Sequence, residues 1–172
     1  MGTLRLYMIE DHRRLDELLE RSIADAQRFD VDAFERFRAG LLRHIGIEEK
    51  ILLPAARRRR GGEPLAIAAR LRIEHAAIAS LLVPTPDHVL VAEIRQLLAA
   101  HNVLEEQEGG LYEDVESLAG DERELLLQRA RACNEPPLAP HFDGPTVMRT
   151  AAAALAQAES NAMRASARKR EV

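Results

Sequence analysis

Apolar residues recur three or four positions apart along most of the chain, which is the spacing of one face of an α-helix. This pattern predicts four long helices, over residues 3–28, 31–59, 64–83 and 86–108. The breaks between the last three of them fall at Gly61-Gly62 and at Pro84. Short connections between four amphipathic helices favour an antiparallel, up-and-down four-helix bundle.

The remainder of the chain predicts two further helices. A shorter one is expected over residues 111–132, with a break at Gly120-Asp121. Pro136, Pro137, Pro140 and Pro145 exclude continuous helix from the following stretch. The predicted organisation is therefore all-α, with the bundle and a short following helix in residues 1–132, a linker in 133–145 and an Ala-rich C-terminal helix in 146–172. We expect that last helix to dock on the bundle or to form a homodimer contact.

Composition narrows the class of protein. Only 3% of the 172 residues are aromatic, so Leu, Ile, Val and Ala must form the core, and such a core favours helix over strand. The single cysteine, Cys133, excludes an internal disulfide and any metal site built from several cysteines. A net charge of −4 gives no electrostatic case for nucleic acid, and no apolar stretch reaches the roughly 20 residues of a membrane span. Glu10 and Asp11 interrupt the start of the chain before a signal-peptide apolar region can develop. We expect a cytoplasmic protein without a membrane or nucleic-acid partner.

Each of the four bundle helices places one histidine on the face that should be apolar. These residues are His12, His44, His75 and His101. One such histidine alone is usually a hydrogen-bonded core residue. Four of them buried close together, with carboxylates beside them, would cost several kcal/mol for each unpaired charge. A buried cation site explains the pattern best.

Two carboxylates share one spacing from these histidines. His44 and Glu48, like His101 and Glu105, form the pattern H-x-x-x-E, which places both residues on one helix face about 6 Å apart. A histidine can then bind one metal while the carboxylate one turn away bridges two. The candidate metal ligands are thus His12, His44, Glu48, His75, His101 and Glu105, too many for one ion and nearly enough for a dinuclear centre. Ferritin-type bundles use Glu-x-x-His, and no Glu precedes His44, His75 or His101 by three residues. A ferritin-like site is therefore disfavoured.

These residues resemble the hemerythrin-like, or HHE cation-binding, domain family over about residues 3–112. The matching segments are Glu10–His12, His44–Pro54, Glu74-His75 and His101–Glu106. The resemblance implies a four-helix bundle that holds two non-haem iron ions. It implies that His12 and His44 bind one iron, that His75 and His101 bind the other, and that Glu48 and Glu105 bridge the pair. The ligand types themselves would also accept manganese or zinc.

The chain departs from the oxygen-carrying members of that family in two places. Leu71 and Ala79 stand where a fifth histidine would lie on either side of His75. One metal is therefore expected to keep an open position, where a small ligand such as dioxygen, nitric oxide or peroxide could be bound or sensed. Two alternatives stay open: a di-iron oxidoreductase of the peroxidase or ferroxidase type, and a metal-dependent regulatory or interaction module. The second departure, the insertion over residues 107–112, is expected to change the end of the bundle and not the metal layer.

Several polar residues near the candidate ligands have two interpretations. Asp11, Glu49, Glu74 and Glu106 could hydrogen-bond to a ligand imidazole, but we expect ordinary solvated side chains. His88 is expected at the surface, and His141 in the linker is expected to face solvent rather than to supply the fifth ligand. Tyr7 is expected to pack in the core.

Overall fold

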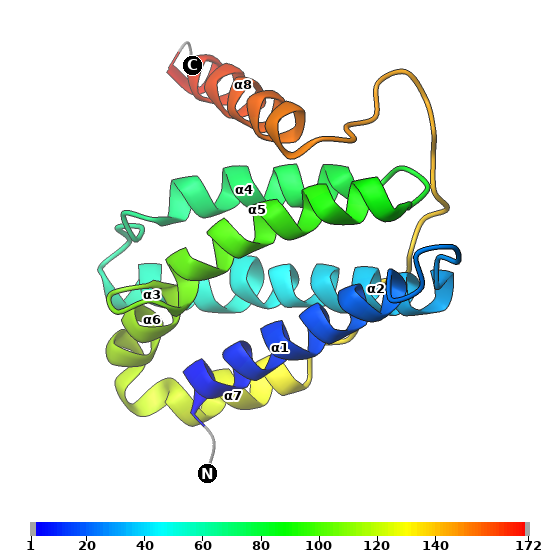
Figure 1. Cartoon of the computed structure of the whole chain (residues 1–172). Coiled ribbons are helices and arrows are strands. Elements are labelled where there is room, and N and C mark those ends of the chain that lie inside the picture. Colours follow the sequence, from blue (N-terminus) through cyan, green and yellow to red (C-terminus); the bar gives the residue numbers. More distant parts are fainter. Residues whose placement is uncertain (1–2, 171–172) are drawn as a thin grey trace.

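The computed structural model describes residues 3–170, and within them all regular secondary structure is helical (Figure 1). This confirms the all-α prediction. The body consists of α1 (Leu4–Ser22), α2 (Val31–Ile47), α4 (Ala68–Leu81) and α5 (His88–Glu106). A π-helical turn (Glu48–Leu52) joins α2 to α3 (Leu53–Arg59). Then follow α6 (Leu111–Ala119), a 3₁₀ turn (Gly120–Glu122), α7 (Arg123–Arg131) and, after the linker, α8 (Ala151–Arg170).

The first helix ends at Ser22, so its predicted extension to residue 28 is wrong. The Asp25 carboxylate accepts a hydrogen bond from the Gln27 amide at 2.8 Å, which offers the backbone an alternative to helix. The Asp30 amide then donates to the Ser22 carbonyl at 2.9 Å and closes the turn. The Asp30 carboxylate caps α2 by accepting from the Ala33 amide at 2.9 Å.

The break predicted at Gly120-Asp121 is confirmed. Gly120 has a φ of 55°, which glycine adopts without steric cost, and the 3₁₀ turn that it starts separates α6 from α7. The Ala-rich helix begins at Ala151, later than the predicted residue 146.

Two apolar clusters fill the interior, one on each side of a polar layer. The first cluster includes Leu4, Met8, Ile47, Leu52, Leu71 and Leu111. The second includes Leu15, Phe34, Phe37, Leu41, Ile78 and Ile94. Each bundle helix runs from one cluster to the other and carries one of the four histidines between them; His12, for example, lies between Met8 and Leu15. The alternation of the apolar stripe therefore positions the polar layer.

The C-terminal helix α8 packs on α4 and α5 of the same chain (Figure 1). Ala151, Ala154 and Ala158 are buried there and belong to the second cluster. Docking on the bundle was one of the two expectations for this segment, while the homodimer contact stays a prediction. Residues 1–2 and 171–172, which fall at the ends of the predicted first and last segments, lie outside the described residues. Within residues 3–170, no helix combines the length and the apolar character needed to cross a bilayer.

Candidate metal centre

All six predicted ligand residues are buried in the polar layer, and their donor atoms converge. They form two groups of four in which the donor atoms lie within 4.8 Å of one another. One group is His12, His44, Glu48 and Glu105, and the other is Glu48, His75, His101 and Glu105. Both carboxylates belong to both groups. We call these the His12–His44 group and the His75–His101 group.

Each carboxylate faces one imidazole from each group. Glu48 Oε1 lies 3.2 Å from His44 Nε2, and Glu48 Oε2 lies 3.1 Å from His75 Nε2. Glu105 Oε2 lies 3.3 Å from His12 Nε2, and Glu105 Oε1 lies 3.1 Å from His101 Nε2. A carboxylate placed in this way can bind two cations through its two oxygens.

Three buried atoms of the His75–His101 group form no well-directed hydrogen bond among the described residues, although they lie about 3.1 Å from neighbouring atoms of the group. They are Glu48 Oε2, His75 Nε2 and Glu105 Oε1. Leaving a buried polar atom unsatisfied costs roughly 1–3 kcal/mol, more when the group is charged. A cation at this position would be contacted by all three atoms, so the residues present fit a bound metal.

The segment after Glu48 is a π-helical turn rather than regular α-helix. Pro54 cannot donate a hydrogen bond, and its ring would clash with the Lys50 carbonyl four residues earlier in a regular helix. The helix widens instead, and the Leu53 amide bonds to the Glu48 carbonyl. Such turns are frequent at functional sites. Pro54, inside the predicted helix, was the sequence signal for it.

A carboxylate from another helix accepts a hydrogen bond from the outer nitrogen, Nδ1, of every layer histidine. The pairs are Glu106 with His12 (2.5 Å), Asp11 with His44 (2.9 Å), Glu49 with His75 (2.8 Å) and Glu74 with His101 (2.8 Å). The expectation that these four acidic residues are merely solvated is therefore wrong. Because an ionised carboxylate only accepts, Nδ1 must carry the proton, and the Nε2 lone pair of a neutral ring points into the layer.

The layer attracts positive charge. Burial lowers the pKa of His44, but Glu48 and Asp11 outweigh it and bring the pKa to about 10. In the same way burial is outweighed by carboxylates at His75, whose pKa rises to about 11, and at His101, whose pKa rises to about 9. Burial and the neighbouring Glu105 raise the pKa of Glu48, yet His44 and His75 bring it down to about 2. Two ionised carboxylates thus favour positive charge beside them. When no metal is bound, protons on the imidazoles supply that charge.

Tyr112 enters the layer from α6, and the sequence analysis missed it. Its side chain is fully buried, and its hydroxyl lies 3.0 Å from His44 Nε2 and 3.1 Å from His12 Nε2. The same hydroxyl donates to Glu48 or Glu105, whose oxygens lie at 2.6 and 3.1 Å. Burial, with the two glutamates, raises the pKa of Tyr112 well above its usual value, so the phenol keeps its proton while no metal is bound. The expectation that the 107–112 insertion leaves the layer unchanged is wrong.

The Gly109-Gly110 turn brings Tyr112 there. Gly109 has a φ of 71°, and a Cβ on Gly110 would lie only 2.7 Å from the Glu105 carbonyl oxygen. Two glycines therefore let α6 begin directly against the end of α5. In the sequence, a Gly-Gly pair followed by a tyrosine just after the second H-x-x-x-E was the available signal that Tyr112 enters the layer.

The other residues singled out from the sequence lie outside the layer. His88 Nε2 is 2.9 Å from the Asp25 carbonyl oxygen. His141 Nε2 is 2.5 Å from a Glu35 oxygen, so this histidine neither supplies a fifth ligand nor simply faces solvent. Tyr7 packs against the first apolar cluster, as expected, and its hydroxyl accepts from Arg43.

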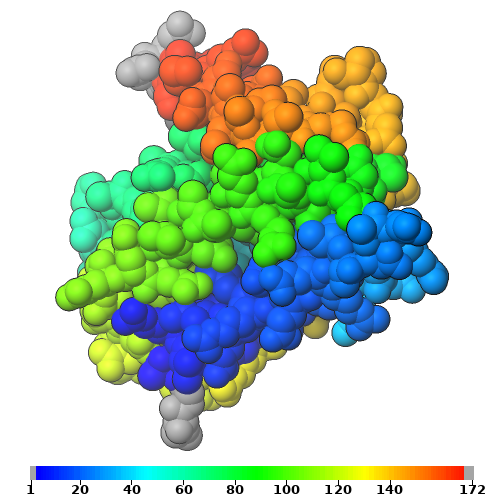
Figure 2. Space-filling model, in the orientation of Figure 1, coloured from blue at the N-terminus to red at the C-terminus, as the bar shows by residue number. Residues whose placement is uncertain are grey.

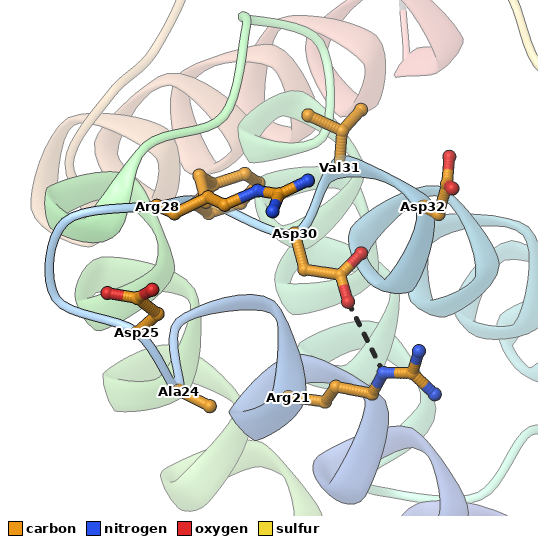
Figure 3. Close-up of a pocket in the computed structure, with 8 residues that line it drawn as sticks. Arg21, Ala24, Asp25, Arg28, Asp30, Val31 and Asp32 are labelled. Atoms are coloured by element: carbon orange, nitrogen blue, oxygen red, sulfur yellow. Dashed lines mark hydrogen bonds and ion pairs between the residues drawn. The ribbon is translucent and has the colours of Figure 1, made fainter.

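Two cavities open on the surface. The larger, about 640 Å³, lies at the loop between α1 and α2, where Arg21 pairs with Asp30 (Figure 3). No layer residue lines it. The smaller, about 400 Å³, lies between α1 and α5 and is lined by both His12 and its partner Glu106. Figure 2 shows the face on which these two helices meet.

The family model described as the hemerythrin HHE cation-binding domain matches residues 5–110 of the chain. This range covers α1 from its second residue, all of α2 to α5 and all six predicted ligands, and it ends before Tyr112. No curated protein and no solved structure gives a significant match.

Proposed function

The chain belongs to the hemerythrin HHE cation-binding family, and on that basis we propose that it binds two non-haem iron ions and uses them to bind or sense dioxygen, nitric oxide or peroxide. One observation supports the dinuclear reading above the others: each of two buried carboxylates faces one imidazole from each of two groups. A single ion would leave half of these donors unused.

We assign His12 and His44 to one iron and His75 and His101 to the other, with Glu48 and Glu105 bridging them. Helices α1, α2–α3, α4 and α5, which supply these residues, form an antiparallel up-and-down bundle in this proposal. The imidazole and carboxylate donors suit iron and would also accept manganese or zinc. Family membership favours iron.

When bound, the iron pair supplies redox chemistry and a coordination position for a small ligand. The chain's own residues prepare that chemistry in two ways. The carboxylates on Nδ1 hold each imidazole in one orientation, and replacing such a partner typically costs 10–100-fold in metal affinity. The apolar clusters on both sides of the layer limit the entry of water.

The decisive experiment measures iron per chain together with the visible spectrum. Wild-type protein loaded with iron should hold close to two irons. His44→Ala and Glu105→Ala should each lose metal, because they remove donors from one and from both groups. His88→Ala is the matched control and should retain wild-type iron, because His88 bonds only to a loop carbonyl outside the layer. Equal iron in all three variants would refute the site.

The same preparation separates the functional classes. The reduced protein should form stoichiometric, reversible adducts with nitric oxide or dioxygen. Continuous consumption of peroxide would instead identify an oxidoreductase. Iron that changes only the stability or the binding of a protein partner would favour a regulatory module.

A further inference from the structure

The hydroxyl of Tyr112 contacts every member of the His12–His44 group. The two imidazole Nε2 atoms and one oxygen of each glutamate surround it at 2.6–3.1 Å. The hydroxyl makes no hydrogen bond with His75 or His101. Its side chain is 0% exposed to solvent. The phenol oxygen therefore stands among the donors of one group alone.

Without a metal, hydrogen bonds satisfy this hydroxyl. An imidazole that holds a second proton donates to the phenol oxygen through Nε2, and the hydroxyl donates to a glutamate. A bound metal would instead take the Nε2 lone pairs of His12 and His44 and one oxygen of each glutamate, so neither imidazole could donate to the phenol. The phenol oxygen, at 2.6–3.1 Å from all four donor atoms, would then lie within reach of the same ion.

The two groups differ in what completes them. In the His75–His101 group, three buried donor atoms form no well-directed hydrogen bond among the described residues. In the His12–His44 group, the imidazole nitrogens of both histidines have the tyrosine oxygen as a neighbour. The protein therefore supplies five donors to a metal in the His12–His44 group and four to a metal in the His75–His101 group.

We propose that Tyr112, as the phenolate, is a direct ligand of the metal held by His12 and His44, so that the small-molecule position lies on the metal held by His75 and His101. This inference rests on the proposed function, since it requires a metal in the layer. On binding, the phenolic proton leaves to solvent and the oxygen–metal bond replaces the oxygen–hydrogen bond. Tyrosinate is an established ligand of ferric iron in haem proteins. The side chain comes from α6, a helix beyond the matched domain.

The test loads wild-type protein anaerobically with ferrous iron, oxidises it in air, and records iron content, visible absorption and resonance Raman spectra. Tyrosinate bound to ferric iron gives a charge-transfer band in the visible and enhanced phenolate vibrations. Tyr112→Phe keeps the ring that packs in the first cluster and removes only the oxygen. It should lose the band completely while binding at least one iron per chain. Tyr7→Phe is the matched control, because the chain has 2 tyrosines, and it should keep the band.

Each outcome bears on a different claim. Two irons in wild-type protein without phenolate vibrations would overturn the tyrosine ligand and leave the di-iron proposal intact, as would a band that survives in Tyr112→Phe. Failure of wild-type protein to take up iron would overturn the proposed function itself. If Tyr112→Phe does not fold, wild-type protein made with ring-deuterated tyrosine still decides. Shifted phenolate vibrations, retained in Tyr7→Phe, would assign the ligand to Tyr112.

Discussion

In the metal-free polar layer, protons on the imidazoles balance the negative charge of the carboxylates. Glu48 and Glu105 are both buried; Glu48 contacts imidazoles of two helices and Glu105 contacts imidazoles of three. Their negative charge raises the pKa of His44, His75 and His101 far above 6.5, so these rings hold protons in the metal-free fold at neutral pH. A bound metal would displace those protons, so metal ions and protons compete for the same imidazole nitrogens.

We predict that the metal-free protein is most stable in mildly acidic solution. A histidine whose pKa is raised in the fold contributes stability that is complete below its unfolded pKa of about 6.5 and is lost as pH rises through the folded values of about 9 to 11. The pKa values of Asp11 and Glu48 are lowered to about 2, so their contribution disappears as pH falls from about 4 toward 2. The melting temperature should therefore fall on both sides of pH 4.5–6.5.

Thermal melts of chelator-treated protein between pH 3 and pH 10 check this directly. Iron-loaded protein provides the comparison, and its alkaline loss should be smaller because metal ions replace the protons. A metal-free melting temperature that rises from pH 6 to pH 9 would contradict the charge assignment of the layer.

At the scale of elements, a tight turn decides what enters the site. The end of α5 and the start of α6 approach so closely at Gly110 that an added Cβ would lie 2.7–2.9 Å from three carbonyl oxygens. Tyr112 follows within the first turn of α6. The position of its hydroxyl thus depends on a backbone contact and not on the tyrosine alone.

Gly110→Ala should displace α6 and move the Tyr112 hydroxyl out of the layer. We expect a loss of about 1–3 kcal/mol in the free energy of unfolding, as for other overpacked sites, and a weakened phenolate band in the iron-loaded protein. Gly46→Ala is the control: it lies in α2, a Cβ there meets nothing within 4 Å, and alanine should stabilise the helix by about 0.5–1 kcal/mol. Denaturant unfolding and visible spectra measure both effects. An unchanged band in Gly110→Ala would show that the turn does not position the tyrosine.

The helices and the six layer residues could be predicted because both follow from periodicity along single helices. One histidine on the apolar face of each of four helices indicates a buried polar layer. The carboxylates on Nδ1 could not be found in this way, because each pairs with a histidine of another helix: Asp11 precedes His12 but bonds to His44. Tyr112 was missed for the same reason, since only the close contact between α5 and α6 brings it inward.

On the scale of the whole molecule, the polar layer divides the core, and α8 covers only one half. The small residues of α8 meet the second cluster, which also includes the fully buried Ala77 of α4. Small side chains let the two helices approach closely, so this contact has little room for added atoms. No layer residue lies on α8. Docking of this helix should therefore affect stability and leave the iron site unchanged.

Ala154→Leu tests this separation. Ala154 is 1% exposed in the second cluster, so three added carbons must force α8 away from α4, at a cost of about 1–3 kcal/mol. For a chain of this length the melting temperature should fall by about 2–4 °C for each kcal/mol, with iron per chain unchanged. Ala153→Leu, one residue away on the exposed side of the same helix, should stay within about 0.5 kcal/mol of wild type. Equal melting temperatures for the two variants would mean that α8 does not dock through this face. Loss of iron in Ala154→Leu alone would mean instead that the packing of α8 on the second cluster affects iron binding in the layer.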